Sequence, residues 1–221
     1  MNNTFKFDEP SWLAQAFVAS VPQGLLLDIP RVVREATRQA YLRDPELLPG
    51  VRRDKFPIDR RALVETSVHA LAARYASQGV TATEKKNKTH NYSHIELVSG
   101  RVVMIPAAVE ADDSLVRDAD YRTSLAKNPQ LAFSGAGFHP HATPPGDAVL
   151  AVVLYGPSSD YPHAAEDAGP GFVVVRFPAD DWSCYVEGRV DLLGRLADTE
   201  KAKGDALRVE LRSQEDQQEA R

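Results

Sequence analysis

Residues 89–106 bring several chemically active side-chain types together. His90, Tyr92, His94 and Glu96 occupy alternate positions, which is the spacing that places side chains on one face of a β-strand. A histidine beside a carboxylate can act as a general base, and both groups can bind a metal ion. In an extended strand His90 and His94 would be about 13 Å apart, too far to share one ion, whereas His94 and Glu96 would be about 6.6 Å apart. We therefore predict that His94 and Glu96 form a catalytic pair.

A second pair of histidines could complete a metal site. His139 and His141 flank Pro140, whose fixed backbone angle holds the segment extended so that both rings can point the same way. Together with His94 and Glu96, they would supply three or four nitrogen and oxygen ligands suited to a divalent metal such as Zn, Fe or Mn. This hypothesis assumes that the two pairs meet in space. The alternative is that His94 and Glu96 are ordinary polar residues of a sheet face and that the other histidines belong to a surface loop.

The charge distribution points to a binding surface. The net charge is −5, yet residues 31–101 hold 14 Lys and Arg against 8 Asp and Glu, whereas residues 102–221 hold 11 against 20. Such a basic segment is typical of a protein that contacts nucleic acid or another phosphate-bearing partner. The predicted contacts are Arg31, Arg34, Arg38, Arg52, Arg53, Arg60, Lys85, Lys86 and Lys88. The alternative is a solvated bipolar surface, or one that attracts a protein partner or a second copy of the chain.

The sequence gives little support for a cysteine-based catalytic site or for a nucleotide-binding fold. Cys184 is the one cysteine of the chain, so an intramolecular disulfide and a cysteine-rich zinc site are excluded. Its acidic neighbours Asp180 and Asp181 disfavour a reactive thiolate. The sequence has no glycine-rich phosphate loop after a strand and no Gly-x-Ser-x-Gly motif, which removes two common catalytic folds.

Helical periodicity dominates the first third of the chain. Apolar residues recur at helical spacing over residues 10–20 and again from about Asp28, where Pro30 would lie in the first turn. The clearest pattern covers residues 57–79, with Asp59 as the expected cap. We therefore predict three N-terminal helices.

The periodicity then changes to the alternation of β-strands. Residues 80–87 and the hairpin over 89–106 read as strands, and residues 148–156 and 171–178 are near-continuous apolar runs, typical of central strands buried on both faces. A late helix is expected over residues 184–198. Helices first and strands later favour an α+β fold, in which N-terminal helices pack on a mostly antiparallel central sheet.

The expected hairpin determines the surroundings of the catalytic pair. If Ser99 and Gly100 form a two-residue turn, His94 and Glu96 share one face of the hairpin with apolar side chains of the second strand. Those side chains are Val103 and Ile105, and the other face holds Ile95, Leu97, Val102 and Met104. Apolar residues on both faces predict that both are covered, so His94 and Glu96 should be partly buried and should need partners.

Of the 221 residues, residues 1–210 are expected to form one α+β domain, with a helical part over about 1–79 and a sheet part over about 80–200. The highly charged residues 211–221 are expected to be a disordered tail. The chain begins without a basic and then apolar region, and no run of about 18 apolar residues occurs. These features predict a soluble, cytoplasmic protein with no membrane partner.

Two functional hypotheses follow. The first is a protein that contacts nucleic acid or phosphate and carries a metal-dependent hydrolytic centre at His94 and Glu96. The second is a non-catalytic interaction subunit that uses its basic and acidic halves to bind a protein partner or to form a homo-oligomer. The sequence leaves open whether the protein is an enzyme.

Overall fold

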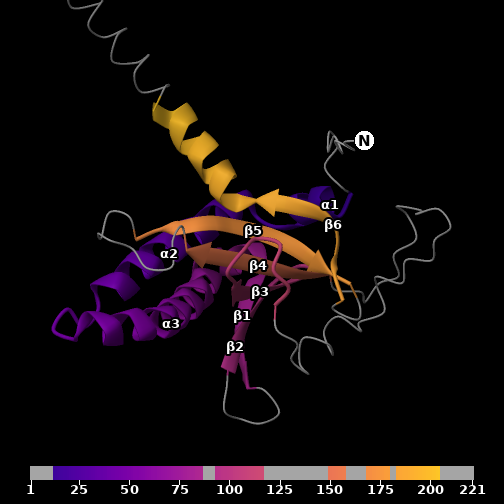
Figure 1. Ribbon diagram of the computed structural model, residues 1–221. Coiled ribbons are helices and arrows are strands. Elements are labelled where there is room, and N and C mark those ends of the chain that lie inside the picture. The colour runs from indigo at the N-terminus through magenta and orange to yellow at the C-terminus, as the bar shows by residue number, and fades with distance from the viewer. Residues whose placement is uncertain (1–11, 87–92, 117–148, 158–167, 180–182, 205–221) are drawn as a thin grey trace, which may run out of the picture.

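The computed structural model describes residues 12–86, 93–116, 149–157, 168–179 and 183–204. Within them the chain forms an α+β fold, as predicted (Figure 1). The helices are α1 (Trp12–Ser20), α2 (Gln23–Leu42) and α3 (Pro49–Tyr75), followed by the 3-10 turn η1 (Ala76–Gln78). The strands are β1 (Val80–Lys86), β2 (Ser93–Ser99), β3 (Val102–Ala108), β4 (Val149–Pro157), β5 (Pro170–Pro178) and β6 (Tyr185–Asp191). A C-terminal helix over residues 192–204 extends away from the end of β6 (yellow in Figure 1).

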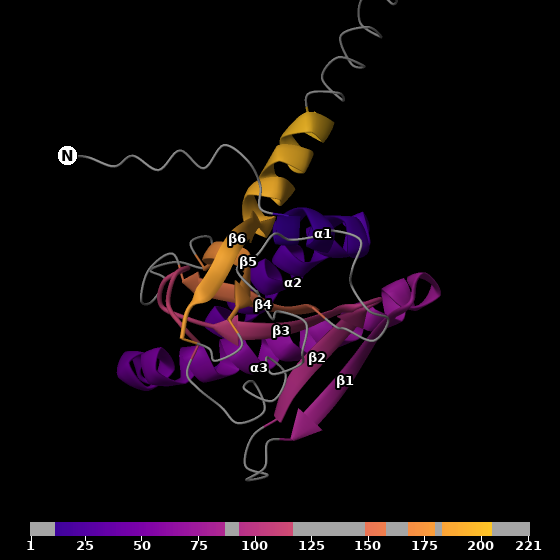
Figure 2. The same cartoon turned by 90° about the vertical axis from the view of Figure 1, so that its right-hand side faces the viewer.

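The strands form one sheet whose order follows the chain from β1 to β6 (Figure 2). Neighbouring strands are antiparallel except β3 and β4, which run in the same direction. Antiparallel neighbours can be joined by a tight turn, whereas a parallel pair needs a connection that returns to the starting end of the sheet. Residues 109–148 make that connection, so the sheet is mostly antiparallel with one parallel pair.

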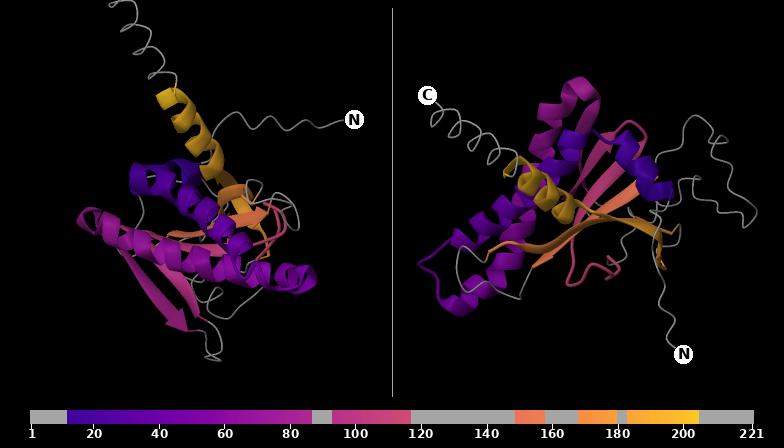
Figure 3. Two further views of the ribbon diagram at one scale, coloured as in Figure 1. Left: turned by 90° about the vertical axis from the view of Figure 1, so that its left-hand side faces the viewer. Right: turned by 90° about the horizontal axis from the view of Figure 1, so that it is seen from above.

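Apolar side chains cover both faces of this sheet. The N-terminal helices pack on one face, where Phe17, Leu25 and Val64 join Leu97 and Val153 in the main core, and the left view of Figure 3 shows α2 and α3 lying together over the strands. A second cluster occupies the opposite face, and its members include Ile105, Leu150, Val152, Leu154 and Val174. Alternate residues of β4 thus enter different clusters, which confirms the expectation of central strands buried on both faces.

The apolar residues of α1 and α2 are largely buried against the sheet. Leu13, Phe17, Leu25 and Ile29 are each 2% exposed or less. No single helix in the described ranges is long and apolar enough to cross a membrane, and α1 and α2 pass that test only as a pair bent by 96°.

Two helices begin earlier than their sequence patterns predict. α2 begins at Gln23, so Pro30 lies inside the helix and not in its first turn. α3 begins at Pro49 and continues through Pro57, so Asp59 lies within the helix and caps nothing. An internal proline removes one helical hydrogen bond, but packing of the apolar side chains on either side can offset that loss. Pro49 itself suits a first turn, where its missing N–H is not needed.

The predicted late helix over residues 184–198 is wrong in its first half. β6 occupies Tyr185–Asp191 and pairs with β5, and the helix starts only at residue 192. The Asp191 carboxylate accepts a hydrogen bond from the backbone N–H of Gly194 at 2.8 Å, which is the geometry of a helix N-cap. Pairing with the sheet edge therefore extends the strand up to the capping residue.

The hairpin turn lies one residue later than expected. Gly100 and Arg101 connect the strands, Gly100 has a φ of 56°, and Leu97 lies opposite Met104 instead of Val102. The partner of each residue thus moves by two positions along β3. Because side chains alternate with a period of two, this shift leaves every side chain on its predicted face.

Candidate functional site

The predicted pair His94 and Glu96 forms a buried network with Lys85 of β1. His94 is 2% exposed and Glu96 is 5% exposed. Glu96 Oε1 lies 3.3 Å from His94 Nε2, and Glu96 Oε2 lies 2.6 Å from Lys85 Nζ. The Lys85 side chain is half exposed. We call these three residues the Glu96 network.

Strand pairing explains why the three side chains meet. β1 and β2 are antiparallel with Lys85 opposite His94 and Thr83 opposite Glu96, so all four residues share the face of the sheet that lies away from the helices. Lys85 is diagonal to Glu96, within reach of a long side chain. The alternation of the sequence thus places His94 and Glu96 on one face of the sheet, and the register of β1 brings Lys85 next to them.

The network has the chemistry of an oriented base. If the Glu96 carboxylate accepts a hydrogen bond from His94 Nε2, the proton of the neutral imidazole resides on that nitrogen. Nδ1 then carries the lone pair, as a general base requires. Glu96 would stabilise the imidazolium that forms when the base takes up a proton, while Lys85 balances the carboxylate charge.

The metal hypothesis depends on residues that lie beyond the network. Within the described part of the chain, no group of three or more His, Cys, Asp or Glu side chains could hold a metal ion. His139 and His141 lie outside the described residues, so their meeting with His94 and Glu96 stays a prediction. A metal ion at Glu96 would also compete with Lys85 for the carboxylate.

Three arginines predicted to contact phosphate lie on α2 and have carboxylate partners within the protein. Arg31 and Arg34 lie 3.8 Å and 3.5 Å from Glu200 of the C-terminal helix. Arg38 lies 3.7 Å from Glu35, one turn away. These pairs are exposed and individually weak, but they reduce the positive charge that α2 presents to a ligand.

The other predicted cationic residues are scattered. Arg52 of α3 donates to the backbone oxygen of Tyr41 at 2.9 Å. Arg53 and Lys86 are exposed, and neither takes part in the ion pairs found among the described residues. Lys88 lies outside the described residues. The described members of the predicted contact set therefore lie on three elements, α2, α3 and β1.

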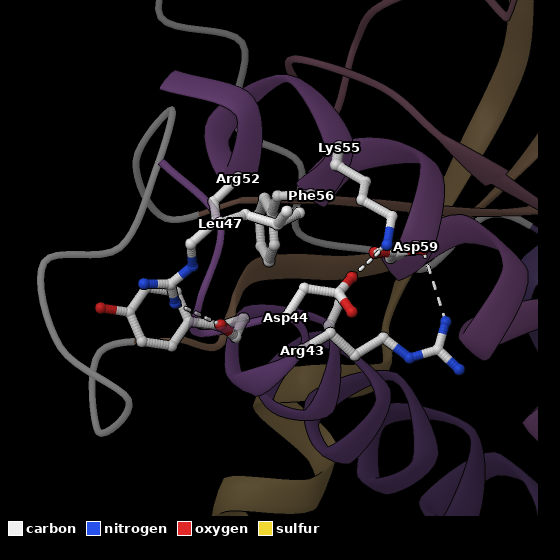
Figure 4. Close-up of a pocket in the computed structure, with 9 residues that line it drawn as sticks. Arg43, Asp44, Leu47, Arg52, Lys55, Phe56 and Asp59 are labelled. Carbon is white, nitrogen blue, oxygen red and sulfur yellow. Dashed lines mark hydrogen bonds and ion pairs between the residues drawn. The ribbon is translucent and has the colours of Figure 1, made fainter. Parts of the chain in front are cut away.

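A charged cluster ties the start of α3 to the end of α2. Lys55 binds Asp44 and lies 3.6 Å from Asp59, and Arg43 lies 3.4 Å from Asp59 (Figure 4). The hydrogen bond to Asp44 raises the pKa of the Lys55 ammonium group. The cavity beside Phe56 measures about 10 Å³, room for one water molecule. This cluster satisfies its own charges and has the character of a structural clamp.

A larger groove lies where the α1–α2 bend faces the C-terminal helix. Its volume is about 360 Å³, within the range of small-molecule pockets. Leu26 and Leu27 of α2 line one side, and Arg195 and Asp198 line the other. Apolar groups beside a few charged ones suit a mixed ligand, although none of the predicted functional residues borders this groove.

Arg60 is a buried cation that contacts two aromatic rings and forms no ion pair among the described residues. Its side chain lies on the sheet-facing side of α3 and is 6% exposed, with Cζ 5.5 Å from the ring centroid of Phe56 and 5.8 Å from that of Tyr155. Arg60 Nε and Tyr155 Oη are both buried without a hydrogen-bond partner among the described residues. We call Arg60, Phe56 and Tyr155 the Arg60 centre.

Burial shifts the pKa values of both ionisable groups of the Arg60 centre. It lowers the pKa of the Arg60 guanidinium and raises the pKa of the Tyr155 hydroxyl. A buried charge that has lost its partner typically costs about 3–5 kcal/mol, whereas one cation–π contact contributes about 0.5–2 kcal/mol. Two such contacts together contribute about 1–4 kcal/mol, which is less than that cost over most of the two ranges.

The two features lie near the same end of the sheet but on opposite faces. Tyr155 pairs with Ala108, close to the carboxyl ends of the parallel strands β3 and β4. β2 begins there with Ser93, whose backbone oxygen accepts a hydrogen bond from Arg61 at 3.4 Å. Carboxyl ends of parallel strands are a common position for ligand sites. The Arg60 centre occupies the helix-covered face, and the Glu96 network occupies the other.

Sequence reasoning placed Arg60 on a binding surface, but a signal for burial was present. Phe56, Arg60 and Val64 are spaced four residues apart and all three are buried. Side chains at this spacing share one face of a helix. An arginine between two apolar residues of such a stripe should have been expected at the helix–sheet interface.

Comparison of the chain with protein-family models found no match. No match was found among curated proteins, and none among solved structures. Function is therefore inferred from the geometry of the described residues.

Proposed function

We propose that this protein contacts nucleic acid or another phosphate-bearing partner at the end of β1, and that the Glu96 network is a hydrolytic centre beside that contact. The observation that supports the proposal is the 5%-exposed Glu96 carboxylate held by both Lys85 and His94. Ionisable groups that are desolvated and paired in this way are concentrated at functional sites. A cytoplasmic location belongs to the same proposal and rests on the composition and the single cysteine.

The proposed chemistry is hydrolysis of a phosphate ester. His94 takes a proton from water, the water oxygen bonds to phosphorus, and the bond to the leaving oxygen breaks. His94 then returns the proton to the leaving group. Lys86 is exposed at the end of β1, on the other face of the strand from Lys85, and attracts the phosphate-bearing partner to this edge of the sheet. Glu96 orients and stabilises the imidazole.

Filter binding with single-stranded and double-stranded oligonucleotides tests the contact. We expect affinity to fall steeply with rising salt, because each phosphate contact releases counterions. Lys86→Gln should weaken binding, whereas Arg34→Gln, which removes an arginine already close to Glu200, should change it little. Absence of binding at low salt, or equal effects of the two substitutions, would contradict the contact.

A hydrolysis assay with a generic phosphodiester substrate tests the centre. Loss of a general base typically costs 10²–10⁴-fold in rate, so His94→Gln should lose activity by about that factor. Thr83→Ala, on the same face of β1 and opposite Glu96, is the matched control. A wild-type protein without activity, or a His94→Gln variant that keeps it while folded, would remove the hydrolytic part of the proposal.

An interaction subunit is the second candidate, and one observation favours it. Four large apolar residues around the α2–α3 connection are exposed: Leu48 by 74%, Ile58 by 69%, Val51 by 48% and Leu42 by 47%. Clustered exposed apolar residues mark interaction surfaces more often than scattered ones do. Light scattering of the wild type and of Leu48→Glu/Ile58→Glu discriminates the candidates. A mass above the monomer that returns to the monomer in the variant, without bound metal, favours this function.

A further inference from the structure

We propose that Arg60 and Tyr155 bind a small oxyanion, the shared chemistry of a phosphate group and a carboxylate, between α3 and β4. This site is independent of the proposed hydrolytic centre because it lies on the helix-covered face of the sheet, where Tyr155 belongs to the main core. A failure of either proposal therefore leaves the other untouched.

The first argument is the uncompensated charge of Arg60. The residue is 6% exposed, its guanidinium contacts two aromatic rings, and no carboxylate of the described residues forms an ion pair with it. The buried Asp28 shows the usual arrangement, because it accepts from Tyr75 at 2.7 Å and from Arg74 at 3.0 Å. An anion from outside the chain would supply what Arg60 lacks.

The second argument is the supply of donors. Arg60 Nε and Tyr155 Oη are buried N–H and O–H groups without an acceptor in the described part of the chain. A guanidinium presents its N–H groups in a planar fork that matches two oxygens of one phosphate or carboxylate. The Tyr155 hydroxyl, on the ring beside that fork, can donate to the same anion. Arg52 and Arg176 also have a buried Nε without a partner, but among the described residues only Arg60 contacts a ring that carries a second orphaned donor.

The third argument is the electrostatic setting of the site. Arg60, Glu65 and Arg61 all act electrostatically on the Tyr155 hydroxyl: the two arginines lower its pKa and the carboxylate raises it. Arg61 Nη2 lies 2.9 Å from Glu65 Oε1, so the positive and negative charges of this pair offset each other. Arg60 therefore leaves the site with one positive charge, suited to one anionic group.

Thermal unfolding of the full chain in added salts tests the site. Inorganic phosphate and acetate are compared with chloride at matched ionic strength. An anion that binds only the folded protein raises the Tm in a saturable way. A rise with phosphate alone identifies a phosphoryl ligand, a rise with acetate alone identifies a carboxylate, and a rise with both supports a general oxyanion site. A Tm that responds to both salts as it does to chloride overturns the proposal.

Arg60→Met separates the anion site from a purely structural arginine. Methionine keeps the aliphatic volume and removes the charge, so the salt response should weaken at least ~10-fold in Kd, while the anion-free variant should be no less stable than the wild type. Arg53→Met, on the exposed side of the same helix, is the control and should keep the full response. A variant that is less stable and still responds to the anion overturns the proposal.

Tyr155→Phe gives a second test that does not depend on the fate of Arg60→Met. It removes one oxygen from a buried ring and leaves the packing in place, so the fold should persist. The Kd for the responding anion should rise at least ~3-fold, as expected for the loss of one hydrogen bond. An unchanged Kd overturns the role of the hydroxyl and with it the site.

Discussion

Single residues differ in how their buried charges are compensated. Glu96 and Asp28 are 5% and 6% exposed, and each has at least two charged or hydrogen-bonding partners. Arg60 is buried to the same extent but is surrounded by aromatic rings. A charge in a low-dielectric interior needs a counter-charge. Glu96 and Asp28 have theirs within the protein, whereas Arg60 has no anionic partner among the described residues.

Removal of the Glu96 charge should destabilise the protein. Glu96→Gln weakens the bonds to Lys85 and His94, and we expect the free energy of unfolding to fall by about 1.5–3 kcal/mol, the range for hydrogen bonds to charged groups. Glu84→Gln removes an exposed carboxylate from β1 and should stay within about 0.5 kcal/mol. Urea denaturation of the three proteins provides the measurement, and equal stabilities would show that the network contributes nothing to folding.

The Tyr75 hydroxyl should make stability fall at alkaline pH. Burial and the hydrogen bond to Asp28 raise its pKa to about 12, whereas an unfolded tyrosine titrates near pH ~10. The unfolded chain therefore loses this proton first. The stabilising contribution is fully present below pH ~10 and is lost as the pH rises through about 12. Urea denaturation across this range should show a steeper decline for the wild type than for Tyr75→Phe, and parallel curves would contradict the assignment.

At the scale of elements, periodicity predicts faces better than ends. The hairpin keeps its predicted faces despite the later turn, because the shift equals the two-residue period of a strand. Helix ends are less well determined by local pattern. α3 starts at Pro49, and the contacts of Arg43 to Asp59 and of Asp44 to Lys55 join the end of α2 to α3; those contacts are tertiary. Local pattern likewise predicts a helix from residue 184, although pairing with β5 makes Tyr185–Asp191 a strand.

The approach of β4 to its neighbours leaves no room for a side chain at Gly156. A Cβ there would lie 2.6 Å from the backbone oxygen of Val109 and would overlap the ring of Phe172. We expect Gly156→Ala to cost about 1–3 kcal/mol, as overpacking usually does. Gly50→Ala is the control, because its Cβ meets nothing within 4 Å and alanine is a better helix former than glycine. Thermal denaturation of both variants should give shifts of opposite sign, and shifts of the same sign would contradict this reading.

The whole molecule is organised around a core that the helices and the sheet share. The main cluster contains residues of α1, α2 and α3 together with residues of all strands from β1 to β6, among them Phe17, Leu25, Val68, Met104 and Phe177. The rings of Phe17 and Phe177 pack edge to face, with their centroids 5.8 Å apart. No boundary in this packing separates a helical unit from a sheet unit within the described residues.

A shared core should make unfolding cooperative. We expect the helices and the sheet to unfold in one transition, which remains a prediction of the single-domain organisation. Far-ultraviolet and near-ultraviolet circular dichroism in urea should give coincident curves. Two separated transitions would instead indicate that the helical and sheet parts fold as distinct units.

The amino-acid sequence alone determines the α+β class, the helical and strand periods, and the faces of the hairpin, because these depend on residue spacing along a regular backbone. It also indicates His94 and Glu96 as a pair, since alternation places them on one face. The tertiary structure decides that Lys85 completes the Glu96 network and that Arg60 points inward to Tyr155. Both contacts join elements whose register and packing are set by long-range burial, and no local pattern contains that information.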